Sequence, residues 1–125
     1  MPTKTFPTTI LTALQKAKII GVRAGKAPHR FIGVWHVVVK NRLFVRPWNN
    51  KPEGWYAAFL KEPQGVLQVA EREVPIKTRK ARGEKLMDAI DAAYAEKYPT
   101  PGSRNYVKGF AQPARRATTL ELLPM

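Results

Sequence analysis

The sequence predicts an α+β protein, because some segments place apolar residues at the two-residue period of strands and others at the spacing of helices. Its 125 residues are a usual length for one domain, and 44% of them are hydrophobic, which suits a folded core and argues against disorder. We therefore expect one domain over residues 1–125, with residues 1–17 as an N-terminal helical extension.

The first half of the chain alternates helix and strand signals. Thr8 or Thr9 can cap a helix, the valine-rich segment that contains Trp35 is the clearest strand, and Asn41 suits a tight turn after it. Pro52 is tolerated in the first turn of a helix. The predicted elements are a helix over 9–17, strands over 18–22, 34–40 and 43–48, with the turn at Asn41-Arg42, and a helix over 52–60.

The second half contains a hairpin and the longest predicted helix. Pro75 lacks an N–H, which favours an edge position for its strand. Acidic residues near the start of the long helix and Lys97 near its end suit the helix dipole, and Pro99 stops it. The predicted elements are strands over 66–70 and 74–80, a helix over 83–98, a short helical turn over 103–110 and a strand over 118–123.

Charge is the unusual feature of the composition. Lysine and arginine total 22 against 9 acidic residues, which gives a net charge of +13 and a pI near 10.4. Such a field attracts polyanions, so nucleic acid, a phosphorylated cofactor and an anionic membrane surface all stay open as partners. No secretory signal or run long enough to span a membrane is visible, and we expect a cytoplasmic protein without a membrane segment.

Several kinds of chemistry find no support in the sequence. There is no cysteine, no P-loop and no Gly-x-Gly-x-x-Gly stretch. His29 and His36 lack the spacing of a helical metal pair, and His36, inside the valine-rich strand, is interpreted as a structural residue. No carboxylate pair or Ser-His-Asp set follows from spacing. We therefore predict no catalytic side chain and no metal site.

The segment from Arg46 to Tyr56 is the best candidate for a ligand site. It follows a strand and precedes a helix, whose free N–H groups and dipole favour phosphate. Basic side chains add charge, amides add hydrogen bonds, and aromatic rings offer stacking surfaces. The alternative interpretation assigns the helix aromatics to the core and leaves the charges in solvent. The predicted cofactor-binding residues are Arg46, Trp48, Asn49, Asn50, Lys51, Trp55 and Tyr56.

Two further groups of residues bear on binding. Arg115-Arg116 precede the last strand and could reach a nearby site, and Tyr106 is a further aromatic residue in that region. A second basic cluster, in and after the strand over 74–80, could contact phosphate, although an exposed edge kept unpaired by its charge is the simpler interpretation. Its members are Arg72, Lys77, Arg79, Lys80, Arg82 and Lys85.

An ordered series of motifs resembles the FMN-binding split-barrel (pyridoxamine-phosphate-oxidase-like) superfamily. The nearest branches are an uncharacterised domain family of unknown function and the deazaflavin-dependent nitroreductase-like proteins. The resemblance covers about residues 18–124 by pattern. The motifs are Val37-Val-Val-Lys-Asn-Arg-Leu-Phe-Val-Arg46, Gly54-Trp-Tyr56, Leu60-Lys-Glu-Pro63, Val66-Leu-Gln-Val69, Tyr98-Pro99 and Thr118-Thr-Leu-Glu-Leu-Leu-Pro124.

The resemblance implies a six-stranded antiparallel split β-barrel with flanking helices, often a homodimer that binds FMN or a deazaflavin at its interface. Arg46 matches the arginine that ends the third strand, and Trp55-Tyr56 match the aromatic pair of the resembling branch. The Gly-Arg-Lys-Ser-Gly phosphate stretch of the nitroreductase-like proteins is absent, and only Lys40-Asn-Arg42 stands in its place.

Three functional hypotheses follow. The first is a flavin- or deazaflavin-binding oxidoreductase, in which the cofactor transfers hydride, Arg46, Asn49 and Lys51 contact phosphate or the ring edge, and Trp48 or Trp55 stacks on the ring. The second is a basic nucleic-acid-binding protein without enzymatic activity, which the charge and interleaved aromatics support. The third is a cofactor-free split barrel that binds a small molecule or another subunit.

Overall fold

The computed structural model describes residues 5–25, 31–47 and 54–125. Both helices and strands are present, which confirms the α+β class. In chain order the elements are α1 (Thr8–Lys16), β1 (Ile20–Ala24), β2 (Ile32–Val34), β3 (His36–Val39), β4 (Arg42–Val45), α2 (Trp55–Lys61), β5 (Gln64–Val69), β6 (Arg72–Lys80), α3 (Glu84–Lys97), α4 (Pro101–Phe110), α5 (Pro113–Arg116) and β7 (Leu120–Pro124).

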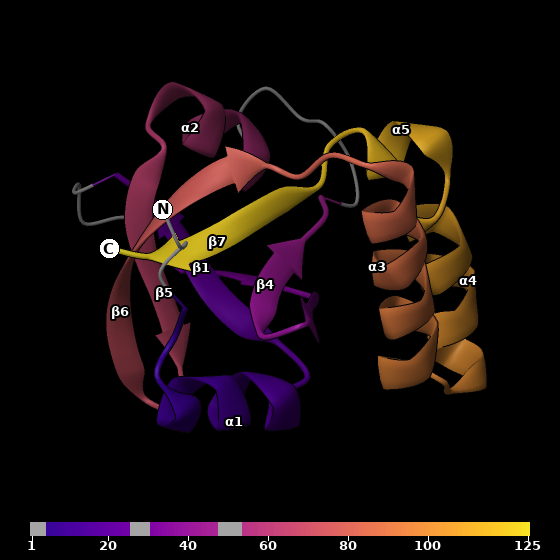
Figure 1. Ribbon diagram of the computed structural model, residues 1–125, viewed down its shortest axis with the longest axis horizontal. Helices are drawn as coiled ribbons and strands as arrows, with labels where there is room; N and C mark the ends of the chain where they lie inside the picture. The colour runs from indigo at the N-terminus through magenta and orange to yellow at the C-terminus, as the bar shows by residue number, and fades with distance from the viewer. Residues whose placement is uncertain (1–4, 26–30, 48–53) are drawn as a thin grey trace.

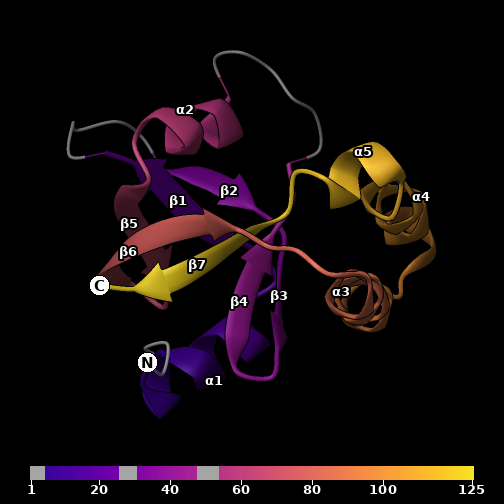
Figure 2. The ribbon, with the colours of Figure 1, turned by 45° about the horizontal axis from the view of Figure 1, so that its top comes forward.

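The strands form one antiparallel sheet that nearly closes into a barrel (Figures 1 and 2). The order of the strands in the sheet is β2-β1-β5-β6-β7-β4-β3. The two edge strands, β2 and β3, are neighbours in sequence, and Trp35 is the single residue between them. The prediction of six strands was therefore one short. A single strand had been expected here, but the chain changes partner at Trp35, since β2 pairs with β1 and β3 pairs with β4.

Two tight hairpin turns use the left-handed backbone conformation. Lys40 and Asn41 have φ values of 52° and 64° between β3 and β4. Ala70 and Glu71 have φ values of 50° and 62° between β5 and β6. Two consecutive residues with positive φ match the right-handed twist of paired strands. The sequence prediction had placed the first turn one residue too late, because Asn41 occupies its second position and not its first.

Pro75 does not lie on an edge strand, so that prediction was wrong. β6 is paired on both sides, with β5 and with β7. The β6–β7 register ends at the pair Ile76–Pro124, one residue before Pro75 is reached. Since the Pro75 carbonyl accepts a hydrogen bond from Met125 N on the β7 side, its nitrogen also faces that side, beyond the end of β7. The missing N–H can therefore remove only the reciprocal bond to Met125, beyond the last pair of the β6–β7 register.

The helices cover the barrel on different sides. α1 and α2 lie at opposite ends of it, and α3, α4 and α5 lie together beside β3 and β4 (Figures 1 and 2). The helical turn predicted over 103–110 was too short, because α4 is a helix of ten residues. Thr100 Oγ1 accepts from Ser103 N at its start and Pro101 occupies its first turn, which are favourable N-terminal features. α5 was not predicted.

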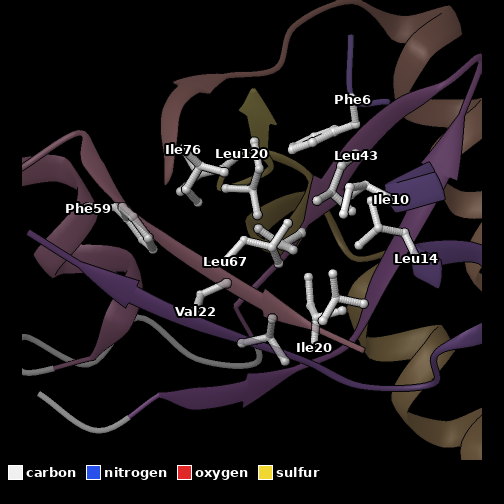
Figure 3. Close-up of a cluster of buried hydrophobic side chains, with 14 of the residues drawn as sticks. Phe6, Ile10, Leu14, Ile20, Val22, Leu43, Phe59, Leu67, Ile76 and Leu120 are labelled. Atoms are coloured by element: carbon white, nitrogen blue, oxygen red, sulfur yellow. The ribbon is translucent and has the colours of Figure 1, made fainter. Parts of the chain in front are cut away.

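Two apolar cores follow from strand alternation. Leu43 points into the barrel and its neighbour Phe44 points out toward α3, as the two-residue period requires. Figure 3 shows the side chains that fill the barrel, among them Phe6, Ile10, Leu14, Ile20, Val22, Leu43, Phe59, Leu67, Ile76 and Leu120. The second core, between β3, β4 and the helices α3 and α4, contains Val37, Phe44, Met87, Ile90, Tyr94, Tyr98 and Phe110.

A buried carboxylate links the side chains of three neighbouring strands of the sheet. Glu121 of β7 is 2% exposed and accepts from Arg42 at 2.8 and 2.9 Å and from Arg79 at 2.9 Å. Burial on its own raises the pKa of Glu121, but the hydrogen bonds and charges of the two arginines outweigh it and hold that pKa below its usual value. Arg79 therefore belongs to a structural ion pair.

No helix in the described part of the chain is both long and apolar enough to cross a membrane. The extent of the domain over residues 1–125 and a cytoplasmic location stay predictions.

Candidate functional site

Arg46 follows directly after β4 and is a structural centre. Its side chain is fully buried. Nε donates to Thr119 Oγ1 at 2.8 Å, and the terminal nitrogens donate to Asp91, to the carbonyl of Phe110 at 3.0 Å and to the sulfur of Met87 at 3.6 Å. The guanidinium thus joins the end of β4 to α3, to the end of α4 and to the residue before β7.

The two predicted helix aromatics have different surroundings. Tyr56 is buried in the barrel core. Trp55, at the first position of α2, is half-buried and meets Tyr56 and Phe59 edge-on, with ring centroids 6.4 Å apart in both pairs. The other predicted residues, Trp48, Asn49, Asn50 and Lys51, lie outside the described residues.

Arg46 and Trp55 line one cavity, although eight residues separate them in sequence. The cavity has a volume of about 390 Å³. It lies where the β2–β3 junction, the end of β4, the start of α2 and one face of α4 meet. We call it the aromatic pocket. Its lining residues are Gly33, Val34, Trp35, Arg46, Trp55, Tyr106 and Phe110.

Trp35 is the central ring of this wall. It stacks on Tyr98 with centroids 4.3 Å apart and planes 6° apart. Tyr106 meets it edge-on at 5.6 Å, and Phe110 meets it at 6.0 Å with a tilt of 41°. Its backbone carbonyl accepts from the hydroxyl of Tyr94 at 3.1 Å. The strand interruption at Trp35 is therefore held in place, and the indole is presented to the pocket.

The sequence indicated part of this wall. Tyr106 had been noted as an aromatic residue in the region of Arg115-Arg116, and it lines the pocket with 49% of its surface exposed. Trp35 and Phe110 were not predicted as site residues. Trp35 was read as an ordinary member of a strand, and nothing in the pattern indicates that the strand breaks there.

Arg46 provides the charge among the described lining residues, and Asp91 compensates it. Asp91 pairs with Arg46 and also lies 3.6 Å from Arg116 Nε. Outside the lining residues, Arg115 Nη1 donates to the carbonyl of Pro47 at 3.3 Å, so a half-exposed cation stands beside the residue that follows Arg46. Burial raises the pKa of Tyr94 far above its usual value, so its phenol stays protonated and donates to Trp35.

A second cavity, of about 560 Å³, lies between the end of β6, the start of α3 and α5. Three cations line it: Lys80, Arg82 and Arg116. Arg116 pairs with Asp88 at 3.0 Å and with Glu84 at 3.5 Å. Among the described residues, no group of three or more His, Asp or Glu side chains is arranged to hold a metal ion.

Comparisons with known proteins give one family and one fold. Residues 9–122 match a family described as "Uncharacterized protein conserved in bacteria" (DUF2255). No curated protein matches the chain. A solved structure with a similar fold is that of the conserved hypothetical protein Rv2991 from Mycobacterium tuberculosis, with a TM-score of 0.57 and 8% sequence identity. The match covers 100% of this chain and 83% of that one.

These matches support the expected link to a domain family of unknown function. They do not name the FMN-binding split-barrel superfamily, which stays a prediction.

Proposed function

Since this chain belongs to the family of uncharacterised proteins conserved in bacteria that matches residues 9–122, we propose a function from its own site: the aromatic pocket binds the planar ring of a flavin-type, phosphorylated cofactor. The observation that carries the proposal is that Trp35, Trp55, Tyr106 and Phe110 come from three separate segments, the β2–β3 junction, α2 and α4, and line one cavity beside a buried arginine.

The pocket suits a ring system in size and chemistry. A volume of about 390 Å³ falls within the range of small-molecule sites, which are mostly apolar with a few polar groups. Each aromatic pair in a good geometry adds about 0.5–1.5 kcal/mol beyond the area it buries. Trp35 is already fixed by Tyr98 and Tyr94, so a ring that stacks on it would not have to order it first.

The roles of the basic residues in this proposal differ from those in the flavin hypothesis drawn from the sequence. Because every nitrogen of the Arg46 guanidinium has a partner in the protein, we assign it to the pocket floor, where its charge lies near the ring, and not to phosphate. We assign the attraction of a phosphate to Arg115, which is half-exposed beside Pro47, the residue that follows Arg46. Lys51 and Asn49 keep their proposed phosphate or ring-edge role, and Trp48 its stacking role.

A bound flavin would supply hydride transfer, and the protein would supply orientation and electrostatics. The aromatic wall would hold the ring and keep water from one of its faces. The FMN or deazaflavin identity of the ligand, the homodimer that the resemblance implies and an oxidoreductase activity all stay within this proposal.

Removal of the Tyr106 ring should weaken flavin binding without unfolding the protein. Tyr106 is 49% exposed, so Tyr106→Ala removes a pocket wall at little cost to the core. We expect wild-type protein to quench FMN fluorescence saturably at micromolar concentration and the variant to bind about tenfold more weakly, which is about 1.4 kcal/mol. Leu60→Ala, which removes an exposed apolar side chain from α2, should leave the affinity unchanged.

The titration is run with FMN and with a deazaflavin. No saturable quenching with either ligand would contradict the proposal. Equal affinities for wild-type protein and Tyr106→Ala would place the ligand elsewhere.

A nucleic-acid-binding function is the second candidate, and the cation-lined cavity at the start of α3 favours it. Lys80 and Arg82 are exposed there, and Lys77 is exposed further back on β6. The interpretation of this cluster as an unpaired sheet edge was wrong, because β6 lies inside the sheet. Contact of three cations with single-stranded DNA predicts a slope of about −2 for log affinity against log salt.

The double variant Lys80→Gln/Arg82→Gln should then flatten this slope by about 1.4 in a fluorescence-anisotropy titration across salt concentrations. Lys61→Gln, an exposed charge removed from α2, is the matched control. An unchanged slope in the double variant would exclude this cavity as the contact surface.

A further inference from the structure

A second cluster of polar groups lies where α1, β3 and the end of α3 meet, and none of its members lines the aromatic pocket. His36, on β3, is completely buried. Lys97 is the last residue of α3, and Lys18 follows α1. Sequence reasoning had interpreted His36 as a structural residue and Lys97 as a helix-end charge, so neither prediction explains why they meet.

Three atoms of this cluster form a closed triangle. His36 Nε2 lies 2.7 Å from the carbonyl oxygen of Leu14 and 2.8 Å from Lys97 Nζ, and Lys97 Nζ lies 3.1 Å from the same carbonyl. An imidazole nitrogen either donates or accepts, so it cannot serve both of its neighbours at once when Lys97 is a charged donor. A neutral Lys97 amine relieves this, because Nε2–H can donate to the Leu14 carbonyl, the amine can donate to the same carbonyl, and the amine lone pair is needed for neither bond.

The surroundings also disfavour a charge on Lys97. Lys18 Nζ donates to the Lys97 carbonyl at 3.0 Å, and the Nζ atoms of Lys18 and Lys97 both lie over the ring of Tyr98, at 5.9 and 5.8 Å from its centroid. Within the described part of the chain, no carboxylate lies within ion-pair distance of either lysine. Burial, and then the charge of Lys18, lower the pKa of Lys97 to about 8.

The same environment keeps His36 neutral. Burial and the Lys97 charge lower the pKa of His36 to about 4, and the Leu14 carbonyl opposes this only in part. His36 Nδ1 has no hydrogen-bond partner among the described residues. A neutral imidazole and a backbone carbonyl therefore hold the Lys97 amine in one position.

The amine has access to a cavity. A space of about 400 Å³ is lined by Lys97 and Lys18, with Gln15, Val38 and Glu96 among its other walls. A small molecule in this cavity would meet a held lysine amine on one wall and an exposed ammonium, that of Lys18, on another.

We propose that Lys97 is a covalent carbonyl-binding site for a small anionic aldehyde or 2-oxo acid, whose negative group pairs with Lys18. The neutral Nζ attacks the carbonyl carbon, a C–N bond forms, and a proton passes from nitrogen to the carbonyl oxygen, which gives a carbinolamine. Loss of that hydroxyl and one nitrogen-bound proton as water leaves an imine. Nothing is oxidised or reduced in this sequence, and water reverses it.

The test traps the imine in the intact protein with glyoxylate and cyanoborohydride at pH 7.5, and mass spectrometry locates the carboxymethyl group among the twelve lysines. We expect Lys97 to be labelled at least about tenfold faster than the exposed Lys61 and Lys85, because a much larger fraction of its amine is neutral. Its labelling rate should level off above about pH 8. The titratable groups that face the Lys97 side chain are His36, Lys18, Glu96 and Tyr98.

Two variants and a neutral aldehyde separate the parts of the proposal. Lys97→Arg should lose this adduct while Lys61 and Lys85 react as before, and circular dichroism checks that the variant is folded. Lys18→Met should slow the reaction of Lys97 with glyoxylate several-fold more than its reaction with propanal. Labelling of Lys97 no faster than that of the exposed lysines would overturn the site, and an equal effect of Lys18→Met on both aldehydes would overturn the anionic substrate class.

Discussion

Replacement of Arg46 by methionine is expected to lower the free energy of unfolding by about 3–5 kcal/mol, the cost of removing one partner from a buried, hydrogen-bonded ion pair. Methionine fills part of the space but donates to none of Thr119, Asp91 and the Phe110 carbonyl. The loss is a large fraction of the stability of an ordinary domain. Urea unfolding followed by circular dichroism measures it.

Arg72→Met is the matched control, since the same substitution on an exposed arginine at the start of β6 should change the stability by less than about 0.5 kcal/mol. Arg46→Lys should fall between the two, because one ammonium cannot reproduce the fork of the guanidinium. A loss below about 1 kcal/mol in Arg46→Met would mean that these bonds do not hold β4 to the helices, and it would return Arg46 to a role in ligand contact.

Gly65→Ala should be almost as damaging, although it adds one methyl group. An added Cβ would lie 2.2 Å from the Arg23 carbonyl oxygen and 2.8 Å from a ring carbon of Phe59. The first contact is with backbone, so relief requires β1 and β5 to separate near the pair Gly65–Ala24. We expect a loss of about 3 kcal/mol, at the upper end for overpacked sites, in the same urea measurement.

Gly102→Ala is the internal comparison, because nothing lies within 4 Å of an added Cβ there. Gly102 is in the first turn of α4, where alanine should stabilise the protein by about 0.5–1 kcal/mol. The two alanine variants should therefore change stability in opposite directions. A tolerated Gly65→Ala would contradict the close approach of β1, β5 and α2.

Local pattern was enough for most of the elements. The valine-rich strand, the hairpin turn containing Asn41 and the long helix near the C-terminus were all found from periodicity and turn residues, within a few residues of their observed bounds. Helical and strand periods are properties of neighbouring residues, so a single sequence contains them. The break at Trp35 is different. It exists because β2 and β3 pair with different strands, and pairing between distant segments leaves no local signal.

The candidate site shows the same division. The sequence by itself determined that charge, amide and aromatic groups cluster between Arg46 and Tyr56, and that the chain carries a net charge of +13. Tertiary structure decided what Arg46 does, because Asp91, Thr119 and Phe110 reach its guanidinium from 45 to 73 residues away. It also brought Trp35 and Tyr106 together, and His36 to Lys97, since closing a barrel and packing helices on it juxtapose residues that no spacing rule connects.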